Sequence, residues 1–250
     1  MLDDGAVNQR KPRIFCWIAT WKANVARVVA VSNTWAPHCD KVVYVTPPAG
    51  LGLPTMDTGV KEGRNGLALY ETELENFDFF LKADDDAFVQ MDRLRAMLAA
   101  HSPDEAAYFG CRLSPYVKDG YMSGGAGYGL SRWVHERRSK EQTFVFREAL
   151  RRFGERRNET RECGPAQEHE DLQMGRCMHA LNVSSLDTRD EQGRHRMLPT
   201  SVQNFFGNPA VWQPFMFYAY PGDRTEKMEH LISVHYVSPK EIFRLYSEHY

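Results

Sequence analysis

Short apolar runs in the first third of the chain alternate with segments in which apolar residues recur at helical spacing. Runs typical of buried strands lie in Arg13–Thr20, in Lys41–Thr46 and around Phe79–Leu81. Helical spacing occurs between these runs, in the sets Val25, Val28 and Val29, then Leu67, Tyr70 and Leu74. Strand, helix, strand, helix, strand is the order that builds a parallel sheet. The pattern therefore predicts an α/β fold with a mostly parallel central sheet flanked by helices.

The remaining segments are less regular, and each carries its own prediction. A Gly- and Pro-rich loop is expected over Ala49–Gly59 and a short strand over Ala106–Gly110. Helices are expected around the pair Leu94 and Leu98, over the basic segment Ser131–Arg161, and over Leu172–Leu181. The arginines of the basic segment are interpreted as a solvated helix face, with a nucleic-acid patch as the alternative.

The composition is that of an ordinary globular protein, and it argues only against a strongly basic class of protein. The 250 residues are 42% hydrophobic and 26% charged, with a formal net charge of -2. That length suits one large α/β domain or two halves that share a cleft. The charge gives no global field for nucleic acid, so no nucleic-acid partner is expected. No apolar run approaches the length of a membrane span.

Three adjacent carboxylates follow the third predicted strand, at Asp84, Asp85 and Asp86. Like charges at this spacing repel one another in a partly desolvated site, so a cation is expected nearby. Hard oxygen ligands suit Mg²⁺ or Mn²⁺, which commonly share their remaining positions with phosphates. In open α/β sheets, ligands bind beyond the carboxyl ends of the strands. A solvated acidic turn is the alternative.

Three other candidates from the second half have structural alternatives of their own. The carboxylates of Glu168–Asp171 open a predicted helix, where they could simply interact with the helix dipole. The aromatic segment Asn204–Tyr220 could form core or a stacking platform for a sugar or peptide. His235 lies in an alternating strand pattern and could be a core histidine or a ligand. The glycines of Tyr121–Tyr128 fit no phosphate-loop pattern and are expected to allow close backbone approach.

Seven short motifs, taken in order, resemble the fringe-like inverting β-1,3-glycosyltransferases, and among them most closely the core 1 β-1,3-galactosyltransferases. The motifs are Trp35–Val42, Lys61–Arg64, Phe80–Asp86, Tyr108–Gly110, Pro115–Tyr128, Glu170–Met178 and Val234–Tyr236. The resemblance covers nearly the whole chain from Arg13. It implies a single GT-A catalytic domain over 13–250 after a tail of 1–12, with a nucleotide-sugar half (13–110) and an acceptor half (111–250). Ser131–Phe146 looks like an insertion relative to the family.

The resemblance also implies roles for individual residues. Asp84, Asp86 and His235 would hold Mn²⁺, and Asp171 would be the catalytic base. The remaining expected contacts are Asp84, Asp85, Lys61 and Arg64 for the donor, and Gly124, Gly125, Glu170, Trp212 and Tyr218 for the substrates. The implied reaction transfers galactose from UDP-galactose to the 3-hydroxyl of O-linked GalNAc on glycoproteins. Fringe-type N-acetylglucosaminyl transfer is the alternative reaction, and a non-catalytic chaperone of the galactosyltransferase is an alternative of another class.

The remaining expectations concern location, assembly and cysteines. The resemblance implies a type II membrane protein of the Golgi lumen, with its anchor absent from this sequence, and it allows a homodimer. A disulfide between Cys163 and Cys177 is expected, because it would clamp the segment that carries Asp171. Cys16–Cys39 is the second expected bridge, which leaves Cys111 free.

Overall fold

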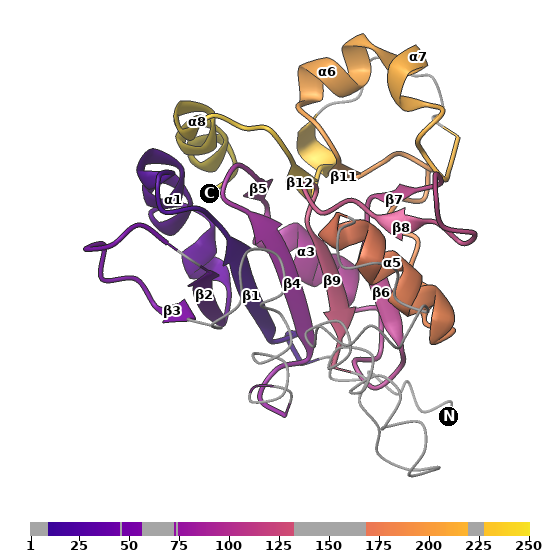
Figure 1. The fold of residues 1–250 in the computed structure, drawn as a ribbon, viewed down its shortest axis with the longest axis horizontal. Helices are drawn as coiled ribbons and strands as arrows, with labels where there is room; N and C mark the ends of the chain where they lie inside the picture. The colour runs from indigo at the N-terminus through magenta and orange to yellow at the C-terminus, as the bar shows by residue number, and fades with distance from the viewer. Residues whose placement is uncertain (1–9, 46, 57–72, 74, 133–168, 220–227) are drawn as a thin grey trace, which may run out of the picture.

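The computed structural model describes residues 10–45, 47–56, 73, 75–132, 169–219 and 228–250. Its centre is a seven-stranded sheet with the order β10-β6-β9-β4-β1-β2-β3 (Figure 1). The strands of this sheet are β1 (Ile14–Ala19), β2 (Lys41–Val45), β3 (Thr55–Met56), β4 (Phe79–Asp84), β6 (Ala107–Gly110), β9 (Tyr128–Ser131) and β10 (Ser184–Ser185). All neighbouring pairs are parallel except the two that β9 makes with β4 and β6. The predicted α/β fold is confirmed, and the central sheet is mixed.

The sequence did not predict three of these strands, namely β3, β9 and the two-residue β10. β3 lies inside the segment expected to be a loop, where it adds two residues to the sheet edge beside β2. β9 includes Ser131, which was expected to begin a helix. An added Cβ at Gly129 in β9 would lie 2.1 Å from the ring of Phe109, so the glycine allows this strand to pass the neighbouring aromatic ring. Most of the predicted basic helix lies outside the described residues, as does the helix expected around Leu67.

Both faces of the sheet are buried, as β1 illustrates. Ile14, Cys16 and Ile18 point into one core, whereas Phe15 and Trp17 point into the other. This alternation is the period of two expected of a strand covered on both faces. It explains why the strand is a continuous apolar run in the sequence.

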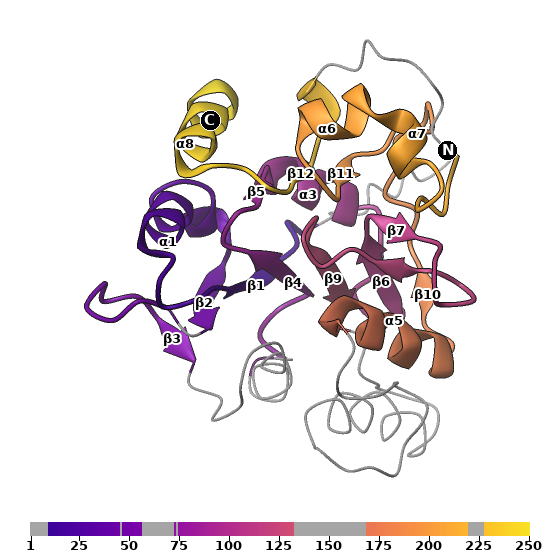
Figure 2. The ribbon, with the colours of Figure 1, turned by 45° about the horizontal axis from the view of Figure 1, so that its top comes forward.

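Helices cover the two faces unequally, as Figures 1 and 2 show. Side chains of α1, α3 and α8 pack into the larger core, and α5 covers the opposite face. The helices are α1 (Val25–Ser32), α3 (Met91–Leu98), α5 (Glu170–Ala180), α6 (Val202–Gly207), α7 (Pro209–Trp212) and α8 (Pro239–His249), with 3₁₀ turns η1 (Ala36–His38) and η3 (Met228–His230). None of the described helices is both long and apolar enough to cross a bilayer.

Two small sheets lie beyond the carboxyl end of β4 and build the site. β5 (Phe88–Val89) follows β4 directly and pairs antiparallel with β12 (Ser233–Val234), which pairs parallel with β11 (Met197–Leu198). The other small sheet joins β7 (Arg112–Leu113) to β8 (Tyr121–Met122). Because β12 pairs with β5, the residue after β12 is brought back to the turn that follows β4. The short helices α6 and α7 form a lobe above these small sheets (Figures 1 and 2).

The cysteines agree with expectation as far as they are described. Cys16 and Cys39 form a disulfide, which ties β1 to the segment that precedes β2. Cys111 is free and buried. Cys177 is disulfide-bonded, whereas Cys163, its predicted partner, lies outside the described residues.

Candidate active site

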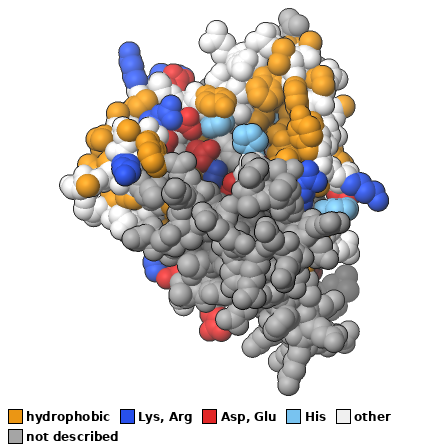
Figure 3. Space-filling view, viewed as in Figure 1, with side chains coloured by type: hydrophobic (Ala, Val, Ile, Leu, Met, Phe, Trp, Pro, Cys, Tyr) orange, Lys and Arg blue, Asp and Glu red, His pale blue; other side chains and the backbone are white. Residues whose placement is uncertain are grey.

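A carboxylate–histidine cluster lies at the carboxyl end of β4. His235 Nε2 is 3.1 Å from Asp86 Oδ1 and 3.8 Å from Asp84 Oδ2. The three side chains each offer one ligand atom, and these atoms lie within 4.8 Å of one another. Two carboxylate oxygens and one imidazole nitrogen form a donor set that suits a divalent metal such as Mn²⁺. On the face drawn in Figure 3, acidic and histidine side chains gather beside hydrophobic ones.

A backbone hydrogen bond fixes the orientation of His235. Its Nδ1 lies 3.1 Å from the carbonyl oxygen of Pro199, and a carbonyl can only accept, so Nδ1 carries the proton. In the neutral ring, the lone pair is therefore on Nε2, which faces the two carboxylates. Such an outer partner is the usual arrangement for a metal-binding histidine. The exposed ring of Tyr236 stacks on His235 at a centroid distance of 3.8 Å.

Gly125 provides the space that the His235 ring occupies. A Cβ added at Gly125 would lie 2.0 Å from the ring atoms Cε1 and Nδ1, a distance that no relaxed structure allows. The neighbouring Gly124 is also tightly packed, with 3.3 Å between an added Cβ and both Asp171 Cβ and Lys82 Nζ. These glycines therefore do allow close approach, as expected, and the groups that approach their backbone are side chains of the site. Their contact with substrate remains a prediction.

The middle carboxylate of the triplet faces its own chain. Asp85 Oδ2 accepts hydrogen bonds from Thr20 Oγ1 at 2.5 Å and Asn24 Nδ2 at 2.9 Å. Burial raises the pKa of Asp85, and these two hydrogen bonds oppose the rise. Because Thr20 follows β1 and Asn24 precedes α1, Asp85 holds the β1–α1 connection against the end of β4. A role for Asp85 in binding the donor remains a prediction.

Two neighbours, His235 and Arg27, favour the charged form of Asp86. Burial disfavours the charge, but the interactions with His235 and with the Arg27 guanidinium outweigh it and lower the pKa of Asp86. Arg27 lies in α1, and its guanidinium is 3.2 Å from Asp86 Oδ2 and 3.5 Å from Asp85 Oδ1. Sequence reasoning missed Arg27, because helical periodicity places it on the polar face of α1 without indicating what that face meets.

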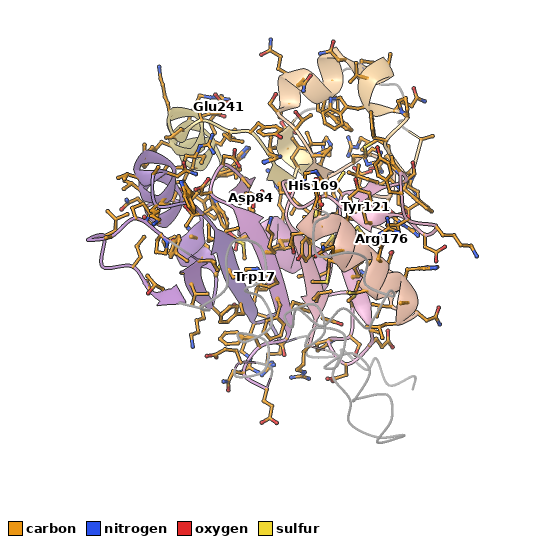
Figure 4. All side chains as sticks on the ribbon, viewed as in Figure 1. Trp17, Asp84, Tyr121, His169, Arg176 and Glu241 are labelled. Carbon is orange, nitrogen blue, oxygen red and sulfur yellow. A yellow bond between two sulfur atoms is a disulfide. The ribbon has the colours of Figure 1, made fainter. Side chains whose placement is uncertain are left out.

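The first turn of α5 carries Glu170 and Asp171, and Figure 4 labels the residue before them, His169, at the start of this helix. Asp171 Oδ2 accepts the amide N–H of Gly124 at 3.0 Å, and its Oδ1 accepts that of Leu172 at 2.8 Å. Glu170 instead accepts a hydrogen bond from the hydroxyl of Tyr128. The two successive carboxylates therefore have different partners, as the angular separation of helix positions predicts.

Burial raises the pKa of Glu170 to about 7. The charges of Asp171 and Asp84 act in the same direction, whereas the charge of Lys82 and the Tyr128 hydrogen bond oppose it. Lys82 lies in β4, and its ammonium contacts Asp84 Oδ1 at 2.6 Å and the carbonyl oxygen of Gly124 at 3.1 Å. Lys82 lies within the motif Phe80–Asp86, but the sequence did not indicate its contact with Gly124, which lies far along the chain.

The aromatic segment lies on the lobe and is only partly buried. Trp212 packs between Phe205 and Phe215, with ring centroids 6.5 and 6.4 Å away, and its indole nitrogen has no hydrogen-bond partner among the described residues. Tyr218 receives a hydrogen bond from Arg112 at 3.2 Å and has the guanidinium of Arg189 3.8 Å above its ring. The hydrophobic patch of Figure 3 lies over this part of the molecule. Trp212 therefore belongs to the lobe, whereas Tyr218 packs against Arg112 of β7 and Arg189.

Two predicted donor contacts, Lys61 and Arg64, lie outside the described residues, as does most of the proposed insertion. Among the described positions, Asp84, Asp86 and His235 form the cluster, and Asp171 is linked to it through Lys82 and Gly124.

Comparisons with known proteins identify relatives over most of the chain. Residues 11–190 match the family described as Fringe-like. The glycoprotein-N-acetylgalactosamine 3-beta-galactosyltransferase 1 of Xenopus laevis is 32% identical over 263 residues, which cover 97% of this chain and 68% of that protein. A beta-1,3-glucosyltransferase of Mus musculus is 26% identical over 136 residues, which cover 49% of this chain and 28% of that protein.

Two solved structures are similar at greater distance. One is a glycosyltransferase involved in glycosylation of the major capsid of PBCV-1, with 10% identity, a TM-score of 0.48, and coverage of 94% of this chain and 100% of that one. The other is the apo-form glycosyltransferase GlyE of Streptococcus pneumoniae TIGR4, with 14% identity, a TM-score of 0.46, and coverage of 90% and 55%. These similarities are too distant to support an argument about function.

The family match and the curated relatives define the class of the protein, which is a glycosyltransferase. The chain belongs to the Fringe-like family and is related to the core 1 galactosyltransferases.

Proposed function

We propose that this protein transfers galactose from UDP-galactose to the 3-hydroxyl of O-linked GalNAc on glycoproteins, with Mn²⁺ and with inversion at the anomeric carbon. The observation that carries the proposal is the cluster of Asp84, Asp86 and His235, in which the histidine presents Nε2 to two carboxylates. The choice of donor and acceptor is supported by the 32% identity to the galactosyltransferase of Xenopus laevis.

The cluster suits a divalent ion that is shared with a diphosphate. Each of the three residues contributes one ligand atom, which leaves other coordination positions for phosphate oxygens and water. Bound there, the ion would stabilise the negative charge that develops on the UDP leaving group. Arg27 lies beside Asp86 and adds positive charge on the α1 side of the cluster. Donor contacts from Asp84, Asp85, Lys61 and Arg64 belong to the same proposal.

Asp171 is the proposed catalytic base. In direct displacement the incoming hydroxyl approaches opposite the leaving group, and a carboxylate on that side takes its proton. Backbone amides from two segments hold both Asp171 oxygens, so its orientation is fixed before substrate binds. Glu170 is the neighbouring alternative, but its carboxyl is engaged by the hydroxyl of Tyr128.

The proposed acceptor side is the 111–250 half, and its lobe supplies the recognition surface. Trp212 and Tyr218 present aromatic rings there, and Val211 and Phe215 are also exposed. A sugar face or peptide side chain would bind such rings through apolar area without a charge requirement. Gly124, Gly125 and Glu170 would border the same substrate from the side of the sheet.

The cellular setting is also a proposal and rests on the family. The enzyme would act in the Golgi lumen as a type II membrane protein. UDP-galactose and a GalNAc-bearing glycoprotein would be its partners there.

The test is a donor screen with a defined acceptor. A peptide carrying α-GalNAc is incubated with Mn²⁺ and UDP-galactose, UDP-glucose or UDP-N-acetylglucosamine, and the product linkage is read by NMR. We expect a β-1,3-linked galactose product that disappears in excess chelator. A preference for UDP-glucose would instead favour the activity named for the Mus musculus relative. Preference for UDP-N-acetylglucosamine, or no transfer from any donor, would contradict the proposed reaction.

A further inference from the structure

Lys82 is a buried cation that connects the two chemical parts of the site. It lies in β4 and retains only 7% of its surface exposed. Side chains alternate along a strand, so Lys82 and Asp84 project from the face of the sheet that α5 covers. Its ammonium contacts Asp84 Oδ1 at 2.6 Å, while Asp84 Oδ2 is the oxygen that faces His235. Asp84 therefore has one oxygen for the metal cluster and one for Lys82.

The same ammonium reaches Asp171 through the backbone of a single residue, Gly124. It donates to the carbonyl oxygen of Gly124 at 3.1 Å, and the amide of Gly124 donates to Asp171 Oδ2 at 3.0 Å. A continuous path of hydrogen bonds thus runs from Asp84 through Lys82 and Gly124 to Asp171. The path is tightly packed, since a Cβ at Gly124 would lie 3.3 Å from both Lys82 Nζ and Asp171 Cβ.

A neighbouring strand reinforces this geometry. Tyr128 in β9 is the antiparallel partner of Lys82, and its hydroxyl donates to Glu170. The paired strands therefore hold both carboxylates of the first turn of α5, one through Tyr128 and the other through Gly124.

We propose that Lys82 is a positioning residue that sets the placement of Asp171 relative to the metal-binding carboxylates. The inference rests on the proposed function, in which Asp171 takes the acceptor proton while the donor is held at the cluster. A misplaced base loses rate even when the donor binds normally, because proton transfer requires aligned groups at hydrogen-bond distance. A lysine that only neutralised buried charge would affect stability without affecting turnover by the folded enzyme.

Kinetics of Lys82→Met and Lys82→Arg separate these two roles. Lys82→Met keeps similar length but removes the charge and all three hydrogen-bond donors. We expect its kcat for transfer to fall by about tenfold or more, with binding of UDP in the presence of Mn²⁺ changed by less than about threefold. Lys82→Arg, which keeps the charge and the donors, should recover part of the kcat. Normal kcat in folded Lys82→Met, or equal loss of UDP binding and turnover, would overturn the proposal.

Gly124→Ala tests the same path while retaining Lys82. Its methyl group would lie 3.3 Å from both Lys82 Nζ and Asp171 Cβ, and its backbone has no positive φ that would add strain. Gly207→Ala is the matched control, because an added Cβ there meets nothing within 4 Å. With acceptor at saturation, where its affinity no longer affects the rate, we expect reduced kcat in Gly124→Ala and unchanged kcat in Gly207→Ala. Equal kcat in the two variants would contradict the path through Gly124.

Amide hydrogen exchange at Gly124 tests the hydrogen-bonded path from Lys82 to Asp171 without measuring turnover. The Gly124 amide should exchange about tenfold faster or more in Lys82→Met than in wild type, because its carbonyl anchor is lost. This amide should be unaffected in Gly207→Ala. Unchanged exchange in Lys82→Met would refute the positioning role even if the protein transferred no sugar. Conversely, faster exchange in a protein that transfers no sugar would leave the path intact and contradict only the proposed function.

Discussion

The two sides of the candidate site are built in different ways. On the proposed metal side, Asp84 ends β4, Asp86 lies in the turn before β5 and His235 follows β12, and each has a fixed partner. On the lobe, α6 and α7 span six and four residues, and several large apolar side chains remain exposed. The difference indicates that the proposed metal site is fixed through the sheet, whereas the surface proposed for the acceptor is more open.

The difference implies that substitutions on the two sides should affect different quantities. Changes in the cluster should remove metal-dependent chemistry while leaving acceptor affinity nearly intact. Changes on the lobe should weaken the acceptor while leaving the metal in place.

The largest effect is expected for Asp86→Ala. This substitution removes a charged ligand from the cluster, and the cost should exceed the 10- to 100-fold typical of losing an outer partner of a metal ligand. We expect Mn²⁺-dependent turnover to disappear while the circular dichroism spectrum stays native. Full turnover in this variant, or in wild type with excess chelator, would show that the cluster holds no functional metal.

Asp171→Asn should have the next largest effect. The amide keeps the size and one acceptor oxygen but removes basicity, so turnover should fall by on the order of a hundredfold or more. Binding of Mn²⁺ and UDP, measured by calorimetry, should stay near normal. If Asp171→Asn turns over normally while Glu170→Gln is inactive, Glu170 is the base.

Titration of Glu170 should make the free energy of unfolding of the protein depend on pH. Its folded pKa of about 7 lies above its ordinary value of 4.5. Its protonated form is therefore favoured in the folded state, and this stabilisation is complete below pH 4.5 and lost as the pH rises through 7. At one pKa unit per 1.36 kcal/mol, and allowing for partial exposure, we expect on the order of 2 kcal/mol.

Denaturant unfolding without metal at pH 5 and pH 8 measures this effect, with Glu170→Gln as the control. The groups that face Glu170 are Lys82, Tyr128, Asp171 and Asp84. The wild type should lose stability between these pH values relative to the glutamine variant. Parallel stability curves for the two proteins would show that Glu170 is not protonated near neutrality.

Trp212→Ala should have the smallest effect and tests the lobe. Loss of one stacking ring should raise the acceptor KM by about three- to tenfold and leave the donor KM unchanged. The alternative is that the ring is core, since it packs between Phe205 and Phe215. A large fall in Tm with a normal acceptor KM would support core packing and remove Trp212 from the proposal.

Much of the metal side could be predicted from sequence, because it depends on local pattern. The apolar run before Asp84 indicated a strand, and the triplet indicated a cation site at its carboxyl end. The role of His235 came from the family resemblance, since its own strand pattern was equally compatible with a core histidine. Its nearness to Asp86 depends on the antiparallel pairing of β12 with β5, which joins segments far apart in the chain.

The other contacts of the site could not be predicted from the sequence, because they are made by backbone groups of distant segments. The carbonyl of Pro199 that orients His235, and the path from Lys82 to Asp171, use backbone groups that every residue carries. No residue type marks such groups. The reversal of β9 is also absent from the hydrophobic pattern, because parallel and antiparallel strands buried on both faces have similar runs.

The most direct test of the metal site is a calorimetric Mn²⁺ titration, with UDP present, of wild type, Gly125→Ala and Gly207→Ala. Gly125→Ala keeps all three ligands, but its Cβ would occupy the space of the His235 ring, whereas the Gly207 methyl group meets open space. We expect wild type and Gly207→Ala to bind one ion per chain, and Gly125→Ala to bind it at least about tenfold more weakly. Equal Mn²⁺ affinity in Gly125→Ala and wild type would contradict the assignment of His235 to the metal site.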